Sequence, residues 1–108
     1  MAEIYKRVKR GSDLLVNVMV TPIDGYHLSD MLWDIEFYTD KKGYHLRLNK
    51  FDAFIVDEDN YQCPVTTNEF NEGVLWATIN TRVPSEYFKD GYQDESVDFP
   101  VGNTYIYE

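Results

Sequence analysis

Residues 57–60, Asp-Glu-Asp-Asn, place three carboxylates and an amide side by side within the stretch FIVDEDNYQ. Such oxygens are calcium ligands, and an EF-hand loop uses them at alternate positions, with glycine sixth and glutamate twelfth. Counted from Asp57, the third position is Asp59, but the sixth is Gln62 and the twelfth is Asn68, so the pattern fails after two ligands. Because Asp and Asn side chains bond to nearby backbone groups, we interpret the stretch as a turn between two strands. A weak, incidental cation contact is the alternative.

Nucleophilic catalysis and zinc binding need groups that are scarce here, since the chain has one cysteine, Cys63, and two histidines, His27 and His45. A cysteine nucleophile requires a nearby histidine, and a zinc site requires about four ligands at characteristic spacing. Cys63 occupies an inward position of an expected strand, where a cysteine behaves as a small inert apolar residue. No serine lies in a nucleophile-elbow motif, and no glycine-rich phosphate loop is present. We therefore expect no catalytic residue, no metal, no cofactor and no enzymatic activity.

The composition is that of one small domain spanning residues 1–108, with 44% hydrophobic and 16% aromatic residues. These side chains can bury enough apolar surface to offset the chain entropy lost on folding. A lone cysteine cannot form an intramolecular disulfide, which favours a reducing compartment and predicts synthesis in the cytoplasm. No apolar run approaches the ~20 residues that cross a bilayer, and the N-terminus lacks the apolar stretch of a signal peptide. We expect no membrane partner.

Charge is distributed unevenly along the chain. The net charge of −9 argues against nucleic acid as a partner, because phosphate binding needs a cationic surface. The first ten positions nevertheless hold four basic residues against Glu3, a local charge of +3, whereas the remainder has six basic against 18 acidic residues, a charge of −12. This basic arm is either a solvated edge strand protected by charge or a docking strand for an acidic neighbour, such as another copy of the chain. Its residues are Lys6, Arg7, Lys9 and Arg10.

Short segments alternate with a period of two, which is typical of β-strands. Residues 13–20 place four apolar side chains on one face, and Leu15 and Met19 on the other suggest a strand covered on both sides. Residues 31–39 and 44–50 predict a hairpin around a loop at residues 40–43. In that pairing Phe37 faces Leu46 and Ile35 faces Leu48 in the core, while Glu36 faces Arg47 outside.

Further strands are expected through Ala53 and Ile55, over residues 61–65 and 74–81, and at the C-terminal end. The inward face of residues 74–81 is ambiguous. Between two of these strands, Thr66 and Glu69 have the spacing of a capping box, and Gly73 supplies a stop, so we expect one short helical turn there. About seven or eight strands with one helical turn predict an all-β fold, an antiparallel β-sandwich of immunoglobulin-like size. A small closed barrel is the alternative.

Aromatic side chains exceed what one small core can hold, and exposed aromatics are enriched in interfaces and in sugar-binding platforms. A protein surface is the favoured target, and carbohydrate is the alternative. With the four residues of the basic arm, the candidate interface comprises Trp76, Tyr87, Phe88 and Tyr92. The surplus also includes Tyr38, Tyr105 and Tyr107.

The order of elements resembles small immunoglobulin-like virion proteins of tailed bacteriophages of gut Bacteroidales and, more loosely, the N-terminal domain of upper baseplate proteins. The segments that carry this resemblance are YKRVKRGSDLLVNVMV, DIEFYTDKKGYHLRLNK, VDEDNYQCPVTT, GVLWATINTRVPSEYFKDGYQDE and VDFPVGNTYIY.

The resemblance implies a non-enzymatic virion protein, capsid-associated or part of a head fibre, tail or baseplate. Such a protein is made in the cytoplasm of the bacterial host and contacts other virion proteins and itself. A stand-alone β-sandwich module that binds glycans or a host surface is the alternative function.

Overall fold

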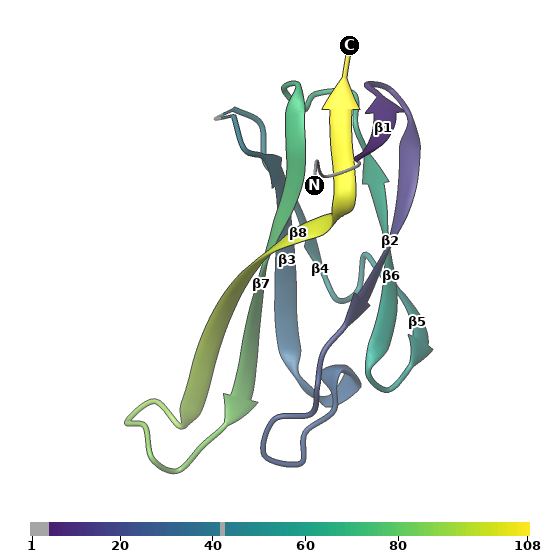
Figure 1. Cartoon of the computed structure of the whole chain (residues 1–108). Helices are drawn as coiled ribbons and strands as arrows, with labels where there is room; N and C mark the ends of the chain where they lie inside the picture. Colours follow the sequence, from purple (N-terminus) through teal and green to yellow (C-terminus); the bar gives the residue numbers. More distant parts are fainter. Residues whose placement is uncertain (1–4, 42) are drawn as a thin grey trace, which may run out of the picture.

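The computed structural model describes residues 5–41 and 43–108 (Figure 1). Within these residues the chain forms eight strands and one 3-10 helix, η1, at Leu28–Asp30. No helix of the described part is long and apolar enough to cross a membrane. The strands are β1 Lys6–Lys9, β2 Asp13–Met19, β3 Leu32–Thr39, β4 Leu46–Asn49, β5 Phe54–Asp57, β6 Asn60–Thr66, β7 Gly73–Pro84 and β8 Tyr92–Tyr107.

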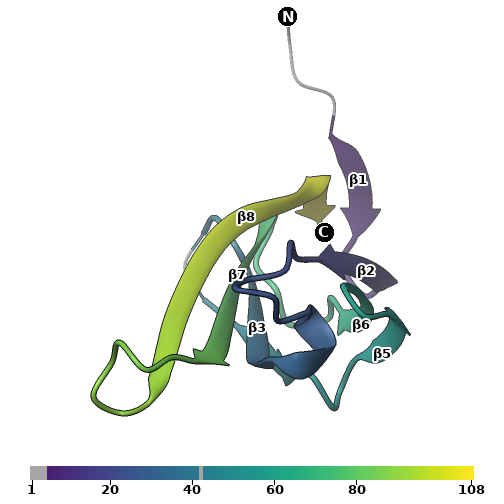
Figure 2. The same cartoon turned by 90° about the horizontal axis from the view of Figure 1, so that it is seen from below.

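The strands form two sheets that enclose a common core, a sandwich-like all-β arrangement (Figure 2). A five-stranded sheet has the order β1-β8-β7-β3-β4, and a three-stranded sheet has the order β2-β6-β5. The turn at Gly11, whose φ of 104° suits glycine, takes the chain from β1 in one sheet to β2 in the other. The expectation of purely antiparallel sheets is wrong at one point, because β1 pairs with β8 in parallel.

The hairpin of β3 and β4 has the predicted register. Phe37 pairs with Leu46, Ile35 with Leu48, and Glu36 with Arg47. Of the predicted loop at residues 40–43, Lys42 lies outside the described residues.

Inward side chains of both sheets build the core. On β7 the ambiguity is resolved, because Leu75, Ala77 and Ile79 are buried while Trp76 is half-buried on the opposite face. The largest fully buried side chains come from several elements, so the core joins the two sheets. They are Phe37, Phe70, Leu28, Met31, Ile35, Leu75, Ile106, Val65 and Val83.

The short helical turn lies elsewhere than predicted. Residues 67–72 form turns rather than a helix, and the helical turn is η1. The Thr67 hydroxyl donates to the Ser12 carbonyl at 2.7 Å and accepts from the Gly11 backbone N–H at 2.9 Å. Phe70 is fully buried, so tertiary contacts override the local capping-box signal.

The two parts of the longest strand, β8, have different strand neighbours. Its C-terminal part, Thr104–Tyr107, lies between β7 and β1. Its N-terminal part pairs only with β7 among the described residues, and the β7–β8 hairpin extends past the other strands at the lower left of Figure 1. Pro100 and Gly102, with a φ of 53°, lie between the two parts, where the pairing with β7 also shifts register.

Candidate protein-interaction surface

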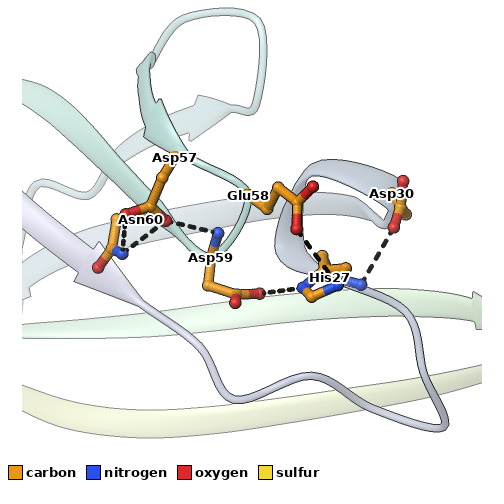
Figure 3. A network of polar contacts seen from close by, with 6 residues as sticks. All are labelled: His27, Asp30, Asp57, Glu58, Asp59 and Asn60. Atoms are coloured by element: carbon orange, nitrogen blue, oxygen red, sulfur yellow. Dashed lines mark hydrogen bonds and ion pairs between the residues drawn. The ribbon is translucent and has the colours of Figure 1, made fainter.

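The acidic stretch forms the turn between β5 and β6, which supports its interpretation as a strand connection (Figure 3). Asp57 Oδ1 accepts the Asp59 backbone N–H at 2.9 Å, and Asn60 Nδ2 donates to both Asp57 oxygens at 2.6 and 2.7 Å. These hydrogen bonds to the charged form lower the pKa of Asp57 below its ordinary value. The carboxylate that would lead a calcium loop is therefore already engaged within its own turn.

The same turn holds the segment before η1. His27 Nδ1 lies 3.0 Å from Asp59 Oδ1, and its Nε2 lies 3.3 Å from Glu58 Oε2. The hydrogen bond with Asp59 is the main cause of a pKa of His27 above its ordinary value. The His27 backbone N–H also donates to Asp30 Oδ2 at 3.2 Å (Figure 3). Within residues 5–41 and 43–108, no group of three or more His, Cys, Asp or Glu side chains could hold a metal ion.

The other chemically active side chains also have structural surroundings. Cys63 is fully buried, and burial raises the pKa of its thiol to about 11, so the thiol is neutral near pH 7. His45 Nδ1 lies 2.9 Å from Glu36 Oε1, and the His45 ring stacks on Tyr38 with centroids 5.0 Å apart.

Two residues of the basic arm, Arg7 and Arg10, contact residues at the end of β8 and just after it. The Arg7 guanidinium lies over the Tyr105 and Tyr107 rings, at 5.7 and 5.1 Å from their centroids. Arg10 Nη2 lies 2.6 Å from Glu108 Oε1. Lys6 and Lys9 are exposed.

The predicted aromatic residues fall into two groups. Trp76 is half-buried near the start of β7, opposite Tyr38, whereas Tyr87 and Phe88 are exposed in the loop after β7. Tyr92 lies near that loop with the Arg82 guanidinium 4.9 Å from its ring centroid. At about 3.3 Å per residue, Trp76 lies roughly 25 Å from the end of β7. Trp76 therefore does not form one surface with Tyr87, Phe88 and Tyr92.

The three-stranded sheet exposes apolar side chains on its outer side. Leu15 is 63% exposed and Met19 is 75% exposed, and both alternate with the buried Val16 and Val18 along β2. On β5, Phe54 is 63% exposed, and it pairs with an outward-facing residue of β6. The expectation that β2 is covered on both sides is therefore wrong for the described chain. We call the following set the apolar face: Leu15, Met19, Phe54 and Pro64, which pairs with Leu15.

The five-stranded sheet presents the opposite chemistry on its outer side, where polar residues on adjacent strands bond to one another. Asn80 Nδ2 donates to Asp34 Oδ1 at 2.8 Å, and Asn80 Oδ1 accepts from Ser96 Oγ. The Thr78 hydroxyl donates to Asp98 Oδ1 at 2.6 Å. We call Asp34, Thr78, Asn80, Ser96 and Asp98 the polar face.

Sequence reasoning named the basic arm and the aromatics but missed the apolar face. A signal was available in Leu15 and Met19, which interrupt the alternation expected of a half-exposed strand. The same pattern arises when a second layer covers the strand, so the sequence alone did not identify a free surface. Comparison of the chain with models of protein families, with curated proteins and with solved structures found no match.

Proposed function

We propose that this chain is a non-enzymatic assembly module of a tailed-bacteriophage virion and that it binds another virion protein through the apolar face. The observation that carries the proposal is the exposure of Leu15, Met19 and Phe54 on one outer side of a sheet. Clustered exposed apolar side chains are costly in water and typically mark protein contacts. The resemblance of the segment order to small virion proteins supplies the biological setting.

The finer fold that fits this role is a β-sandwich of immunoglobulin-like size, a frame whose sheet edges and outer sides serve for contacts. The three-stranded sheet is suited to docking because both of its outer strands, β2 and β5, have a side without a strand partner in the described chain. A second copy of the chain and another virion protein are both partners that the proposal includes.

Mass spectrometry of purified intact particles, combined with chemical cross-linking, tests the proposal. The chain should be present and cross-linked to a capsid, head-fibre, tail or baseplate protein. Its absence from particles of the phage that encodes it would contradict the role. Leu15→Ser should reduce incorporation into particles, whereas Leu32→Ser, the same change at a position of β3 that is 56% exposed on the other sheet, serves as the matched control.

Binding of a glycan or host surface is a second candidate, favoured by Trp76 on the outer side of the five-stranded sheet. Trp76 pairs across the sheet with Tyr38, whose ring stacks on His45, so aromatic rings lie next to the polar face. Aromatic rings beside hydroxyl and carboxylate groups are a common sugar-binding combination. Glycan-array binding that Trp76→Ala abolishes and Tyr87→Ala leaves intact would support it, and no binding by the native chain would remove it.

A further inference from the structure

A groove of about 490 Å³ lies between β2 and the N-terminal part of β8, on the opposite side of β2 from β6. Apolar side chains from both sheets line it. We call it the strand-acceptor groove, and its lining includes Val16, Val18, Met19, Val97, Phe99 and Val101.

Both walls of this groove are strand edges with unused backbone groups. β2 pairs only with β6, residues 92–100 of β8 pair only with β7, and residues 101–103 pair with neither neighbour, in the part of the chain that the structure describes. β1 pairs with β8 no further back than Thr104, so the sheet is one strand narrower beside the groove. A free edge leaves about every second N–H and C=O without a strand partner, which makes it a template for an added strand.

The groove also exposes side chains that belong to the inner side of the five-stranded sheet. Val97 pairs with Ile79, which is buried, and Phe99 pairs with Ala77, which is also buried. Val97 itself is nevertheless 46% exposed, because the three-stranded sheet does not reach over this part of β8. An inserted strand would cover these side chains and complete the core.

The negative charge around the groove favours binding of a positively charged strand. Glu95 lies on the groove wall, and residues 82–98 carry five acidic against two basic side chains. A second copy of the chain brings a net charge of −9, and its basic strand β1 is already paired with β8. Electrostatic complementarity therefore favours a cationic partner of a different sequence.

We propose that the strand-acceptor groove binds an extended segment of another protein, in which apolar side chains alternate and a lysine or arginine meets Glu95. The segment adds a strand between β2 and β8, the mode of recognition known as β-augmentation. Residues 16–21 of β2 and its continuation line the groove, which corresponds to a strand of about 20 Å at ~3.3 Å per residue. The inference goes beyond the proposed function, because its site is the gap between the sheets. The groove and the apolar face share Met19, whereas Leu15, Phe54 and Pro64 lie outside the groove lining.

Two synthetic peptides test the proposal with the full chain. Each has valine at the inner positions and threonine at the alternate positions. One has lysine at both ends and the other has glutamate, so either strand direction presents the same charge to Glu95. The lysine peptide should slow hydrogen exchange of backbone amides in β2 and in residues 92–103, and the glutamate peptide should bind more weakly. Protection elsewhere, or none with either peptide, would overturn the proposal.

Charge reversal at the groove sharpens the test. Glu95→Lys should weaken binding of the lysine peptide by about three- to tenfold and should reverse the preference between the peptides. Glu86→Lys makes the same charge change in the exposed loop of the hairpin, outside the groove lining, and should have less effect. Equal weakening by both variants would mean nonspecific attraction and would contradict the assigned site.

Two controls separate the remaining explanations. If the chain alone shows concentration-dependent protection of β2 and β8, the occupant is a second copy and the proposed partner is wrong. Leu15→Ser removes a side chain of the apolar face and should leave peptide binding unchanged. Failure of the peptide test therefore does not count against the proposed function, and failure of particle incorporation does not count against the groove.

Discussion

The outer sides of the two sheets have opposite chemistry. On the polar face, Asn80 bonds to Asp34 and Ser96, so the cross-strand neighbours satisfy one another's polar groups. On the apolar face, Leu15 and Met19 are exposed on the same side of β2, on either side of Asn17, and no other layer of the described chain covers them.

This difference is the basis for the proposal that the three-stranded sheet meets a protein and the five-stranded sheet meets water. Hydrogen-bonded polar groups keep favourable interactions whether or not a partner is present. Exposed apolar side chains gain about 25 cal/mol per Å² when they leave water, so a partner that covered the apolar face would gain this free energy, and one that covered the polar face would not. The contrast can be tested one residue at a time.

The largest expected effect concerns the core beneath the polar face. Ile35→Ala removes a fully buried side chain of β3 and should lower the free energy of unfolding by about 2–5 kcal/mol. Ile55→Ala makes the same change at a position that is 61% exposed on the edge strand β5, and should cost about 0.5 kcal/mol or less. Urea denaturation measures both. Similar losses for the two variants would show that β5 is buried in solution.

The next effect concerns partner binding by the apolar face. Leu15→Ser should reduce association with virion particles about tenfold, equivalent to ~1.4 kcal/mol, because it removes an apolar anchor. Folding stability should change by only about 0.5 kcal/mol, since the side chain is largely exposed. Co-sedimentation with particles measures association. An equal loss with Thr78→Ala on the polar face would contradict the assignment of the contact to the three-stranded sheet.

A smaller effect is expected from the polar face itself. Asn80→Ala removes hydrogen bonds to Asp34 and Ser96 and should cost about 1 kcal/mol of unfolding free energy. Asn17→Ala on the outer side of β2 removes an exposed amide and should be close to neutral. Denaturant titrations of both variants, with particle association unchanged by Asn80→Ala, would support a structural role for the polar face.

The smallest effect is a pH dependence at the turn between β5 and β6. The raised pKa of His27 means that its stabilising contribution is complete below the ordinary value of 6.5 and is lost as pH rises through the folded-state pKa. Asp59→Asn should move the pKa of His27 back toward its ordinary value, because the bond with Asp59 is the main cause. NMR titration of the His27 imidazole measures this pKa. Glu58→Gln should lower the pKa of His27 by less than Asp59→Asn does. A larger shift from Glu58→Gln would contradict the assignment of the main cause to Asp59.

Local patterns were sufficient to predict the β3–β4 hairpin, because the apolar and charged faces required the same register. Pairing of Glu36 with Arg47 and of Phe37 with Leu46 leaves one consistent alignment. Likewise, the side-chain bonds of Asp57 and Asn60 follow from residue types that favour turns.

Long-range features were not predictable in the same way. The parallel pairing of β1 with β8 joins the two ends of the chain, and no local pattern specifies it. The helical turn expected near Thr66 does not form, because the segment instead buries Phe70. That burial depends on side chains from the whole core. Leu15 and Met19 have the same sequence pattern whether another sheet, a partner or water lies over them, so the apolar face required the three-dimensional structure.

Hydroxyl-radical footprinting of the chain, free and within assembled particles, tests the central claim most directly. Phe54 is 63% exposed on the apolar face and lies outside the groove lining, Tyr87 is 88% exposed in the β7–β8 loop, and Met31 is fully buried as an internal reference. We expect Phe54 to oxidise readily in the free chain and to be protected in the particle, while Met31 remains unreactive in both. Equal oxidation of Phe54 in the two states would contradict docking through the apolar face.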